Sequence, residues 1–348
     1  MSDGERRLRR KTLSDVAARA GVSAVTVSRA LHRPEMVSHD LRARIQTAVD
    51  ELAYIPNQLA SALASSRTAR IGVIVPSFTN GVFGEYLRAL HDTFLPAGFQ
   101  VLVQNSSYAP GTEERAIATM IGQHPEAMIV AGIDQTPQAR HMLVESAIPV
   151  VQTMEITNDP IDVVIGLSHE DAGYAATRHL IDLGHRAIGQ MAVPLDSRAR
   201  QRVAGYHRAM AEAGLEPAHV SRDGPSTFSH GADLIGTMLA RWPNMTALYA
   251  GNDNLALGAM FELHRRGLRV PDDLSIVGFN DLEFSATSYP SLTTVATPRY
   301  AIGQRAAAIV LEIIRGSGER PKDRVIDLGF RLIERQSTAP PAAGAASR

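Results

Sequence analysis

Length, composition and charge place the sequence among ordinary soluble proteins with more than one domain. The chain has 348 residues, 45% of them hydrophobic, and a formal net charge of −1. This length leaves room for two or three domains and a substantial core. The sequence has no cysteine, which excludes a disulfide framework and a thiolate metal site, and no apolar run of about 18 residues that would indicate a membrane span.

Basic residues are concentrated at the start of the chain. Residues 1–70 hold 12 Lys and Arg against 7 Asp and Glu, which leaves 23 basic and 29 acidic residues for the rest. The two parts therefore have net charges of +5 and −6, as in a DNA-contacting module joined to an acidic regulatory one. No apolar stretch follows the basic arm at 1–11, so we expect no signal peptide and a cytoplasmic protein.

Residues 12–31 have the pattern of a helix-turn-helix. Apolar residues recur at helical spacing, Ser14 stands where the first helix needs an N-cap, and Gly21 stands where that helix must end. Ser23 is the predicted cap of a second helix, which begins directly after the turn. A short helical hairpin packed into a larger core would show the same bare pattern.

The polar face of the second helix suits the major groove of DNA. We expect Arg29 to contact base edges, with Ala24 and Val25 making apolar contacts such as those with a thymine methyl group. The hydroxyl-bearing residues nearer the phosphates are Ser23, Thr26 and Ser28.

A third helix is predicted over 38–52, and Pro56 then breaks the helical pattern. Residues 58–64 could form only a short helix, which is not stable alone in water. The stretch 12–70 resembles the DNA-binding headpiece and hinge of the LacI family of bacterial repressors. The strings that carry the resemblance are VAARAGVSAVTVSRAL at 16–31 and YIPN at 54–57.

This resemblance implies a headpiece at 12–56 and a hinge helix and linker at 57–70. The hinge would order on DNA and contact it through Asn57 and Leu63, with Leu63 entering the minor groove. A homodimer would then read the two half-sites of a roughly palindromic operator in double-stranded DNA.

After the hinge, short apolar runs alternate with amphipathic segments, and this pattern occurs in two successive parts of the chain. This pattern predicts two doubly wound α/β lobes with parallel sheets, whose ligand lies at the carboxyl ends of the strands. The predicted strands are 71–75, 100–104, 127–132 and 149–153, and then 162–166, 187–193, 246–251 and 275–279. The predicted helices are 84–96, 113–124 and 137–147, and then 171–184, 200–214, 231–241 and 254–267.

The resemblance adds the topology of periplasmic sugar-binding proteins, in which the chain crosses three times between the lobes. By analogy the crossings lie near 166–168, 294–297 and 321–324. The implied first lobe is 71–165 with 298–321, and the implied second lobe is 166–297 with 322–337. Residues 338–348 are small and proline-rich, and we expect them to be disordered.

Polar and aromatic residues at predicted strand ends are the candidate effector ligands. At strand ends they are Asn252 and Asn280 in the second lobe and Ser77, Phe78, Asn80 and Phe83 in the first lobe. The family resemblance implies that Asn252 contacts sugar hydroxyls and adds Arg202, which opens a predicted helix and matches the arginine that holds the ligand in the family. Arg198 precedes it by four residues. Simpler explanations stand beside these assignments, because Asn252 could only cap a helix, Arg202 could be solvated and Phe83 could be packed in the core.

Arg299 begins the returning helix after the second crossing, where several family members have an apolar or aromatic residue. Together with Arg198 and Arg202 it could surround one carboxylate with guanidinium groups. Strings such as PSFTNGVFGEYLR at 76–88 and PLDSR at 194–198 resemble the gluconate-operon branch of the family. We therefore expect a repressor released by a sugar acid such as gluconate. A neutral sugar, a corepressor or a sugar-binding module that does not bind DNA are the alternatives.

The sequence gives no support to an enzyme or to a bound cofactor. Ser168, His169 and Asp171 have the residue types of a catalytic triad, but they lie almost next to one another, whereas a triad converges from separated positions. His179 and His185 do not share a helix face as zinc ligands would. No glycine-rich phosphate loop is present, so we expect no catalytic residues and no metal.

Overall fold

The computed structural model describes residues 11–55, 67–194, 196–316 and 319–342, and all statements on structure concern these residues. The chain divides into two compact units, Met1–Thr68 and Ala69–Arg348. The basic arm before Lys11, most of the predicted hinge, and its DNA contacts Asn57 and Leu63 lie outside the described residues.

The first unit has a helical bundle with its own small core. Its helices are α1 (Leu13–Ala20), α2 (Ala24–His32), the 3-10 helix η1 (Pro34–Met36) and α3 (His39–Glu51). Val16, Val27 and Ile45, one from each α-helix, are almost completely buried against one another. The helix-turn-helix is therefore part of a closed bundle and is not a hairpin inside a larger core.

The N-terminus of α1 differs in one respect from the prediction. The N-cap is Thr12 and not Ser14, because the hydroxyl of Thr12 accepts a hydrogen bond from Asp15 N at 3.3 Å. The Asp15 carboxylate in turn accepts from Thr12 N at 2.8 Å, which completes a capping box. The prediction for the other end of α1 is confirmed, since Gly21 has a φ of 63°.

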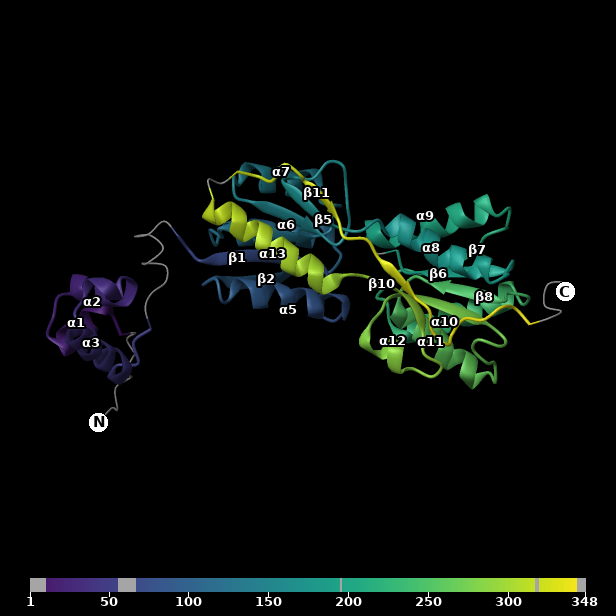
Figure 1. The fold of residues 1–348 in the computed structure, drawn as a ribbon, viewed down its shortest axis with the longest axis horizontal. Coiled ribbons are helices and arrows are strands. Elements are labelled where there is room, and N and C mark those ends of the chain that lie inside the picture. The colour runs from purple at the N-terminus through teal and green to yellow at the C-terminus, as the bar shows by residue number, and fades with distance from the viewer. Residues whose placement is uncertain (1–10, 56–66, 195, 317–318, 343–348) are drawn as a thin grey trace, which may run out of the picture. The chain divides into compact units, whose positions relative to one another are not determined.

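The first lobe of the second unit is a parallel sheet covered by helices on both faces (Figure 1). The strands, in spatial order, are β2 (Gln100–Asn105), β1 (Arg70–Val75), β3 (Ala127–Ala131), β4 (Val150–Thr153), β5 (Val163–Gly166) and β11 (Val325–Asp327). The helices are α5 (Val82–Phe94), α6 (Pro110–Ile121), α7 (Pro137–Glu145) and α13 (Arg299–Arg315). Val73 packs in the cluster with α5 and α13, whereas Ile74 packs with α6 and α7, so β1 is apolar on both faces.

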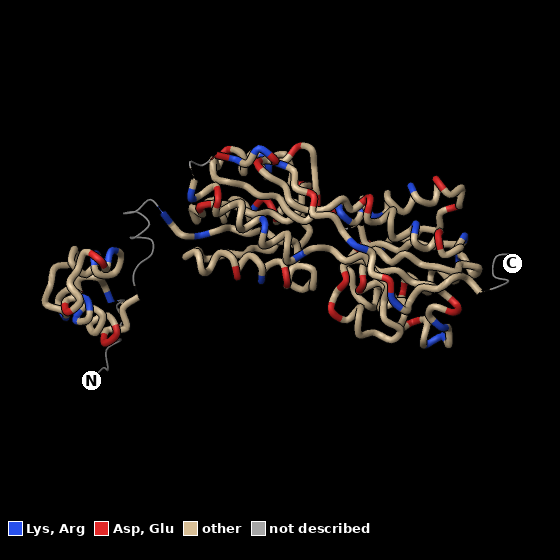
Figure 2. The backbone as a smooth tube through the Cα atoms, viewed as in Figure 1, with Lys and Arg blue, Asp and Glu red and all other residues tan. Residues whose placement is uncertain are grey.

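The second lobe repeats this arrangement, and basic and acidic residues are intermixed on both lobes (Figure 2). Its strands, in spatial order, are β7 (Ala218–Ser221), β6 (Ile188–Ala192), β8 (Ala247–Ala250), β9 (Ser275–Asn280), β10 (Thr293–Ala296) and β12 (Arg331–Ile333). Its helices are α8 (His169–Asp182), α9 (Ser197–Glu212), α10 (Phe228–Arg241), α11 (Asp253–Arg265) and the short α12 (Glu283–Thr287). Only β12 runs antiparallel, against β10. The prediction of two mostly parallel, doubly wound sheets is confirmed.

The chain crosses between the lobes three times, and the third crossing is not where it was predicted. The first crossing follows β5, as expected. The second follows β10 and so begins at 297, because residues 294–296, which were predicted to belong to it, still pair with β9 of the second lobe. Residues 325–327, however, still belong to the first lobe, because β11 pairs with β5 through Val325 and Val164. Arg324 anchors this strand by donating to the carbonyl oxygens of Ile161 and Asp162 at 2.6 and 2.7 Å. The third crossing therefore lies at 328–330 and not at 321–324.

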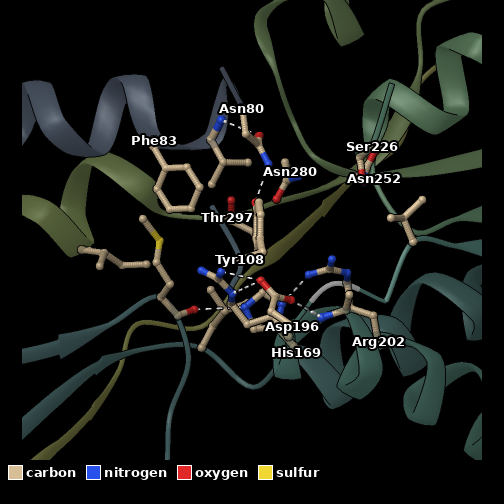
Figure 3. A pocket seen from close by; sticks show the side chains of 17 residues that line it. Asn80, Phe83, Tyr108, His169, Asp196, Arg202, Ser226, Asn252, Asn280 and Thr297 are labelled. Carbon is tan, nitrogen blue, oxygen red and sulfur yellow. Dashed lines mark hydrogen bonds and ion pairs between the residues drawn. The ribbon is translucent and has the colours of Figure 1, made fainter. Parts of the chain in front are cut away.

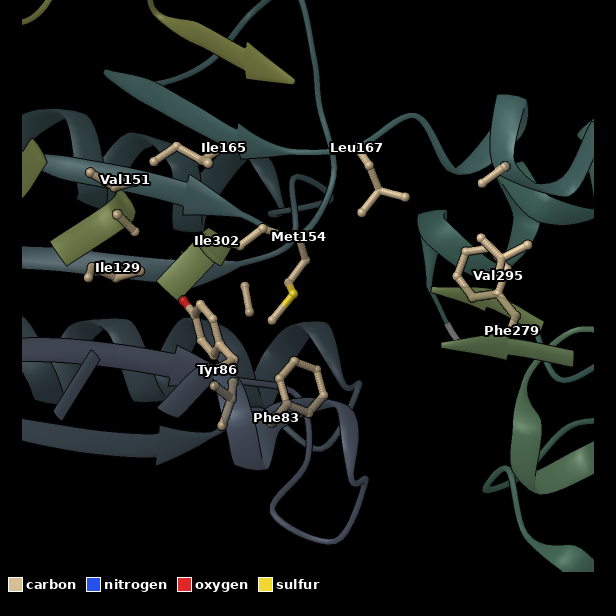
Figure 4. Packing of buried hydrophobic residues seen from close by; sticks show 14 of the residues in the cluster. Phe83, Tyr86, Ile129, Val151, Met154, Ile165, Leu167, Phe279, Val295 and Ile302 are labelled. Atoms are coloured by element: carbon tan, nitrogen blue, oxygen red, sulfur yellow. The ribbon is translucent and has the colours of Figure 1, made fainter. Parts of the chain in front are cut away.

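Apolar packing continues from one lobe to the other beside the first crossing. Leu167 lies at the crossing, with Met154 on the first-lobe side and Phe279 on the second-lobe side (Figure 4). All three are buried members of one cluster.

The prediction of disorder from residue 338 is wrong for the start of that segment. Thr338 Oγ1 lies 3.1 Å from His179 Nε2, and the Ala339 carbonyl accepts hydrogen bonds from His185 and Ser275 at 2.9 and 3.0 Å. Composition misleads here because the segment is held to the second lobe by hydrogen bonds with polar side chains of that lobe and not by apolar packing. Residues 343–348 lie outside the described residues.

The close approach of α8 and α9 can be tested by substituting a glycine at their contact. A Cβ added at Gly205 of α9 would overlap the carbonyl oxygen of Glu170 on α8, whereas a Cβ at Gly84 of α5 would meet no atom within 4 Å. We expect Gly205→Ala to lower the free energy of unfolding by about 1–3 kcal/mol through overpacking. Gly84→Ala should raise it by up to about 1 kcal/mol through helix propensity.

Urea unfolding of the two variants measures both changes. Equal effects from the two substitutions would show that α8 and α9 do not depend on this close approach.

Candidate functional site

The second helix of the headpiece presents a narrow set of side chains to solvent. Val25 is 62% exposed, and Arg29 is exposed one helical turn later on the same face. Ala24, Thr26 and Ser28 are half-buried. The combination of an exposed apolar side chain with one arginine is suited to a groove that offers methyl groups and acceptors.

Two of the predicted phosphate contacts also have a structural role. Ser23 is the N-cap of α2, and its hydroxyl accepts a hydrogen bond from Thr26 N at 3.2 Å. The hydroxyl groups of Ser23 and Thr26 lie 2.9 Å apart. Ser23 remains exposed, so a hydroxyl at this helix end is still accessible to a phosphate.

The two lobes enclose a cavity of about 590 Å³, counting the space that is open to solvent (Figure 3). It lies at the carboxyl ends of strands from both lobes, where doubly wound sheets bind ligands. We call it the effector cavity. It is lined by Asn80, Val82, Phe83, Tyr108, Met154, Leu167, His169, Val193, Asp196, Arg198, Ala199, Arg202, Ser226, Asn252, Asn280, Thr297 and Ile302.

Arg202 is fixed on the wall of the cavity by two neighbours. Its Nη1 lies 3.0 Å from His169 Nδ1, and its guanidinium carbon lies 4.6 Å from the centroid of the Phe279 ring. His169 Nε2 lies 3.0 Å from the Met154 carbonyl oxygen. Since Nε2 must donate to that carbonyl, Nδ1 is the acceptor for Arg202 and the imidazole is neutral. Burial and the nearby guanidinium groups accordingly hold the pKa of His169 well below its usual range.

Asp196 and Arg198 form an ion pair on the same wall. The Asp196 carboxylate accepts from Arg198 Nε and Nη2 at 2.9 and 2.5 Å. Its other oxygen accepts from Ala199 N at 2.9 Å and so caps α9. Burial opposes ionisation of Asp196, but the charges of Arg198 and Arg202 outweigh it and lower the pKa of the carboxyl to about 2.

The remaining polar wall is uncharged. Asn80 donates to the Tyr108 hydroxyl at 3.3 Å, and the Asn80 carboxamide oxygen accepts from Val82 N at 3.1 Å. Asn252 caps α11 by accepting from Leu255 N at 3.1 Å. The capping explanation for Asn252 is thus confirmed, and the same residue also lines the cavity.

Two predicted ligand residues of the first lobe lie outside the cavity lining. The hydroxyl of Ser77 turns back to accept from Asn80 N at 3.1 Å, so it shapes the loop. Phe78 is 59% exposed. Phe83 is 2% exposed and belongs both to the core and to the cavity wall, so the two explanations of this residue are compatible.

Arg299 also does not line the cavity, and the prediction that it surrounds a ligand carboxylate is corrected. Its guanidinium donates to the carbonyl oxygens of Asn280 and Asp281, and it lies 2.9 Å from the carboxylate of Glu85. The side chain is almost completely buried behind the wall. Arg299 therefore fixes the turn that carries Asn280, whose φ of 112° is strained for a residue with a side chain.

Several lining residues were missed in the sequence. They are Tyr108, His169, Asp196, Ser226 and Thr297. His169 follows the first predicted crossing directly, and that position was the available signal. Asp196 precedes α9 as a cap does, so only the position of the neighbouring arginines could have indicated a place on the cavity wall.

A buried carboxylate joins the lobes beside the cavity. Glu155, after β4 of the first lobe, accepts from the hydroxyl of Ser197 at 2.7 and 2.8 Å and from Gln201 Nε2 at 3.0 Å. Both donors are on α9 of the second lobe. Burial raises the pKa of Glu155 to about 7, although Arg198 and Ser197 act in the opposite direction.

A two-lobed ligand-binding domain preceded by a helix-turn-helix defines a ligand-responsive transcription factor, and comparison with known proteins agrees. Residues 12–57 match the family described as "Bacterial regulatory proteins, lacI family", and residues 177–338 match the "Periplasmic binding protein-like domain". The HTH-type transcriptional regulator GntR of Pseudomonas aeruginosa is 38% identical over 331 residues, which cover 94% of this chain and 96% of that protein. The chain belongs to the LacI family of bacterial regulatory proteins.

Solved structures show the same architecture. A LacI-family regulator from Silicibacter pomeroyi has 34% identity and a TM-score of 0.88, with 94% of this chain and 99% of that chain covered. The lac repressor dimer bound to operator and the anti-inducer ONPF has 29% identity and a TM-score of 0.80, with 95% and 100% covered. The chain is thus a DNA-binding, effector-responsive transcriptional regulator and, like its named relatives, not an enzyme.

The described residues contain no group of three or more His, Asp or Glu side chains placed to hold a metal ion. None of their helices combines the length and apolarity needed to cross a membrane.

The contacts of Arg299 predict its contribution to stability. Arg299→Ala would remove a donor from the buried carbonyl of Asn280 and from the part-buried carbonyl of Asp281, and we expect it to lower the free energy of unfolding by about 2–4 kcal/mol. Arg305→Ala is the matched control on the same helix, because its pair with Glu312 at 3.5 Å is exposed and contributes at most about 0.5–1 kcal/mol. Urea unfolding measures both, and equal losses would contradict the role assigned to Arg299.

The raised pKa of Glu155 predicts that the stability of the protein depends on pH. The pKa of its carboxyl is about 7 in the folded chain, against an ordinary value of 4.5, so unfolding releases a proton between these pH values. The contribution of this proton to stability is therefore present at low pH and is lost as pH rises towards 7.

Glu155→Gln should remove this contribution. Between about pH 5 and 7 the free energy of unfolding of the variant should therefore fall by about 2 kcal/mol less than that of wild type. Asp253, whose pKa burial raises to about 6, is unchanged in both proteins and provides a common background slope. Parallel stability curves for wild type and variant would contradict the assignment.

Proposed function

We propose that the protein is a homodimeric repressor, acting in the cytoplasm, that leaves its operator when a sugar acid such as gluconate binds the effector cavity. Strings along the chain resemble the gluconate-operon branch of the family, and similarity to the GntR regulator extends over 94% of the chain. The likeness to the lac repressor dimer on its operator supports the dimer and the palindromic site.

The observation that carries the proposed ligand class is a guanidinium on the cavity wall that has no carboxylate partner. Arg202 lines the cavity, and its Nη1 lies 3.0 Å from a neutral imidazole, that of His169. A buried charge without a counter-charge is costly, and an anionic ligand would supply one. A carboxylate is the strongest acceptor for a guanidinium group.

The charge of the lining agrees with this proposal. Arg198 and Arg202 are positive, Asp196 is negative, and His169 is neutral, so the lining carries a net charge of +1. An effector with one negative charge would neutralise the cavity.

The rest of the lining suits a chain of hydroxyl groups. Amide and hydroxyl side chains supply both donors and acceptors without charge. These side chains are Asn80, Ser226, Asn252, Asn280 and Thr297. Phe83 adds an apolar surface for the carbon side of such a ligand.

We assign operator reading to α2 of the headpiece. Arg29 would contact a base edge, and Val25 would contact a methyl group. Ser23, Thr26 and Ser28 would lie near phosphates, and Ala24 would allow close approach to the groove. Asn57 and Leu63 remain proposed hinge contacts with DNA.

The effector would act by favouring one arrangement of the lobes over another. α9 presents Arg198 and Arg202 to the ligand and Ser197 and Gln201 to Glu155 of the first lobe. A ligand that prefers one position of α9 therefore shifts the population of lobe arrangements by its difference in affinity for them.

Fluorescence anisotropy on an operator found by selection from random DNA tests the proposal. We expect sequence-specific binding that weakens steeply with salt, and release by gluconate. Arg29→Ala should lose about 1–3 kcal/mol of discrimination against other sequences, with unchanged gluconate binding in calorimetry. Arg202→Ala should keep operator binding but lose the response to gluconate.

Each alternative has its own outcome in this experiment. Tighter operator binding with gluconate would identify a corepressor, and release by neutral sugars alone would identify a neutral effector. Absence of sequence-specific DNA binding would leave only a sugar-binding module.

A further inference from the structure

Of the three charged side chains on the cavity wall, two already neutralise each other. Asp196 accepts two hydrogen bonds from Arg198, and their side chains are only 14% and 8% exposed. Asp196 also caps α9, which fixes the carboxylate in place. Arg202 is therefore the one cation of the lining without a carboxylate partner.

The surroundings offer no second free cation. A neighbouring hollow shares Asp196, Arg198 and Tyr108 with the effector cavity and adds Glu113, Asp134 and Arg200 to its lining. Arg200 lies 3.5 Å from the Asp134 carboxylate, so it is paired there. Burial raises the pKa of Glu113 in this hollow, and the nearby carboxylates of Asp134 and Glu114 act in the same direction.

Two more carboxylates lie close behind the walls. Glu155 approaches Arg198 closely enough to raise the pKa of that arginine, together with Asp196. Arg299 is held by Glu85 and by backbone carbonyls. Among the described residues around the cavity, each cation except Arg202 thus has a carboxylate partner.

We propose that Asp196 restricts the effector to molecules with a single negative charge. The Asp196 carboxylate occupies Arg198 and so takes the place that a second anionic group of a ligand would need. A sugar acid with an uncharged hydroxyl at its far end satisfies Arg202 and the amide side chains. An aldarate or a phosphorylated aldonate brings a second charge that finds no free cation in a buried site, where an uncompensated charge is costly.

This inference rests on the proposed sugar-acid function and adds a specificity-determining residue to it. It also changes the role of Arg198. That arginine acts as the fixed partner of Asp196 and not as a second ligand clamp.

Asp196→Asn separates the charge of this residue from its structural role. Asparagine caps helices as well as aspartate does, so α9 should still begin at the same residue. The lining charge rises from +1 to +2, and Arg198 becomes available to a second anion. The variant should therefore gain affinity for dianions, an effect that partial unfolding cannot produce.

Calorimetric titration of the full chain with gluconate, glucarate and glucitol tests the proposal. The three ligands share a six-carbon polyol chain and carry one, two and no negative charges. We expect wild type to bind gluconate more tightly than glucarate by about tenfold or more. In Asp196→Asn this ratio should fall at least about tenfold, or invert.

Asp134→Asn is the matched control. It also removes a carboxylate near the cavity, but one that lines only the neighbouring hollow. This variant should keep the wild-type ratio of gluconate to glucarate affinity. Asp196→Ser, which retains a capping hydroxyl, provides a second variant if the asparagine protein is unstable.

The outcomes separate this inference from the proposed function. Equal affinities of wild type for gluconate and glucarate would overturn the single-charge restriction while leaving a sugar-acid effector intact. An unchanged ratio in Asp196→Asn, or the same change in Asp134→Asn, would overturn the role of Asp196. Binding of glucitol without binding of either acid would overturn the proposed sugar-acid function and the inference with it.

Discussion

The structure of the effector domain depends on the first turn of α9. Asp196 ends the loop after β6 and caps this helix, which fixes the direction of the four side chains that follow. Residues four apart on the first two turns share a face of the helix, and the two faces meet different partners. Arg198 and Arg202 reach the cavity, while Ser197 and Gln201 reach Glu155 in the other lobe. The N-terminal part of this one helix therefore carries both the cavity residues and the contacts to the first lobe, so no other element is needed to link them.

This arrangement explains why polar groups are buried between the lobes. A carboxylate removed from water needs strong donors, and Glu155 obtains its side-chain donors, Ser197 and Gln201, from α9, while Ile133 N of its own lobe also donates at 3.2 Å. Arg299 has the converse role on the other side of the cavity, where it satisfies carbonyl groups of the strained turn after β9. Two buried polar contacts of opposite charge thus hold the lobes together, and each would be costly to break without replacement.

The sequence predicted the parts of the molecule in which local pattern and tertiary structure agree. The helix-turn-helix and most central strands follow from apolar periodicity, because each buries the face that its own sequence marks. The strand at 325–327 was not predicted, because three residues are too few to show an apolar periodicity and the strand forms by pairing with β5. Residues 338–339 are likewise held by hydrogen bonds to His179 and His185 that composition does not reveal.

The candidate site, like the fold, could be predicted from the sequence only in part. Strand ends placed Asn252 and Asn280 on the cavity wall, because parallel sheets gather their carboxyl ends, whereas Arg202, on helix α9, was found through the family resemblance. Arg299 was misplaced because a long side chain can turn either towards a ligand or towards nearby carbonyls, and only the surrounding fold decides. The partnership of Asp196 with Arg198 was missed for the same reason.

The three crossings have a consequence for the order in which the protein can fold during synthesis. The headpiece core is continuous in sequence and is synthesised before either lobe. Neither lobe is continuous, because the first sheet is completed only by β11 and the second only by β12 and the hydrogen bonds of residues 337–339. Two incomplete sheets with open edges must therefore persist until residues 325–339 have emerged, and in this interval the nascent protein is exposed to aggregation.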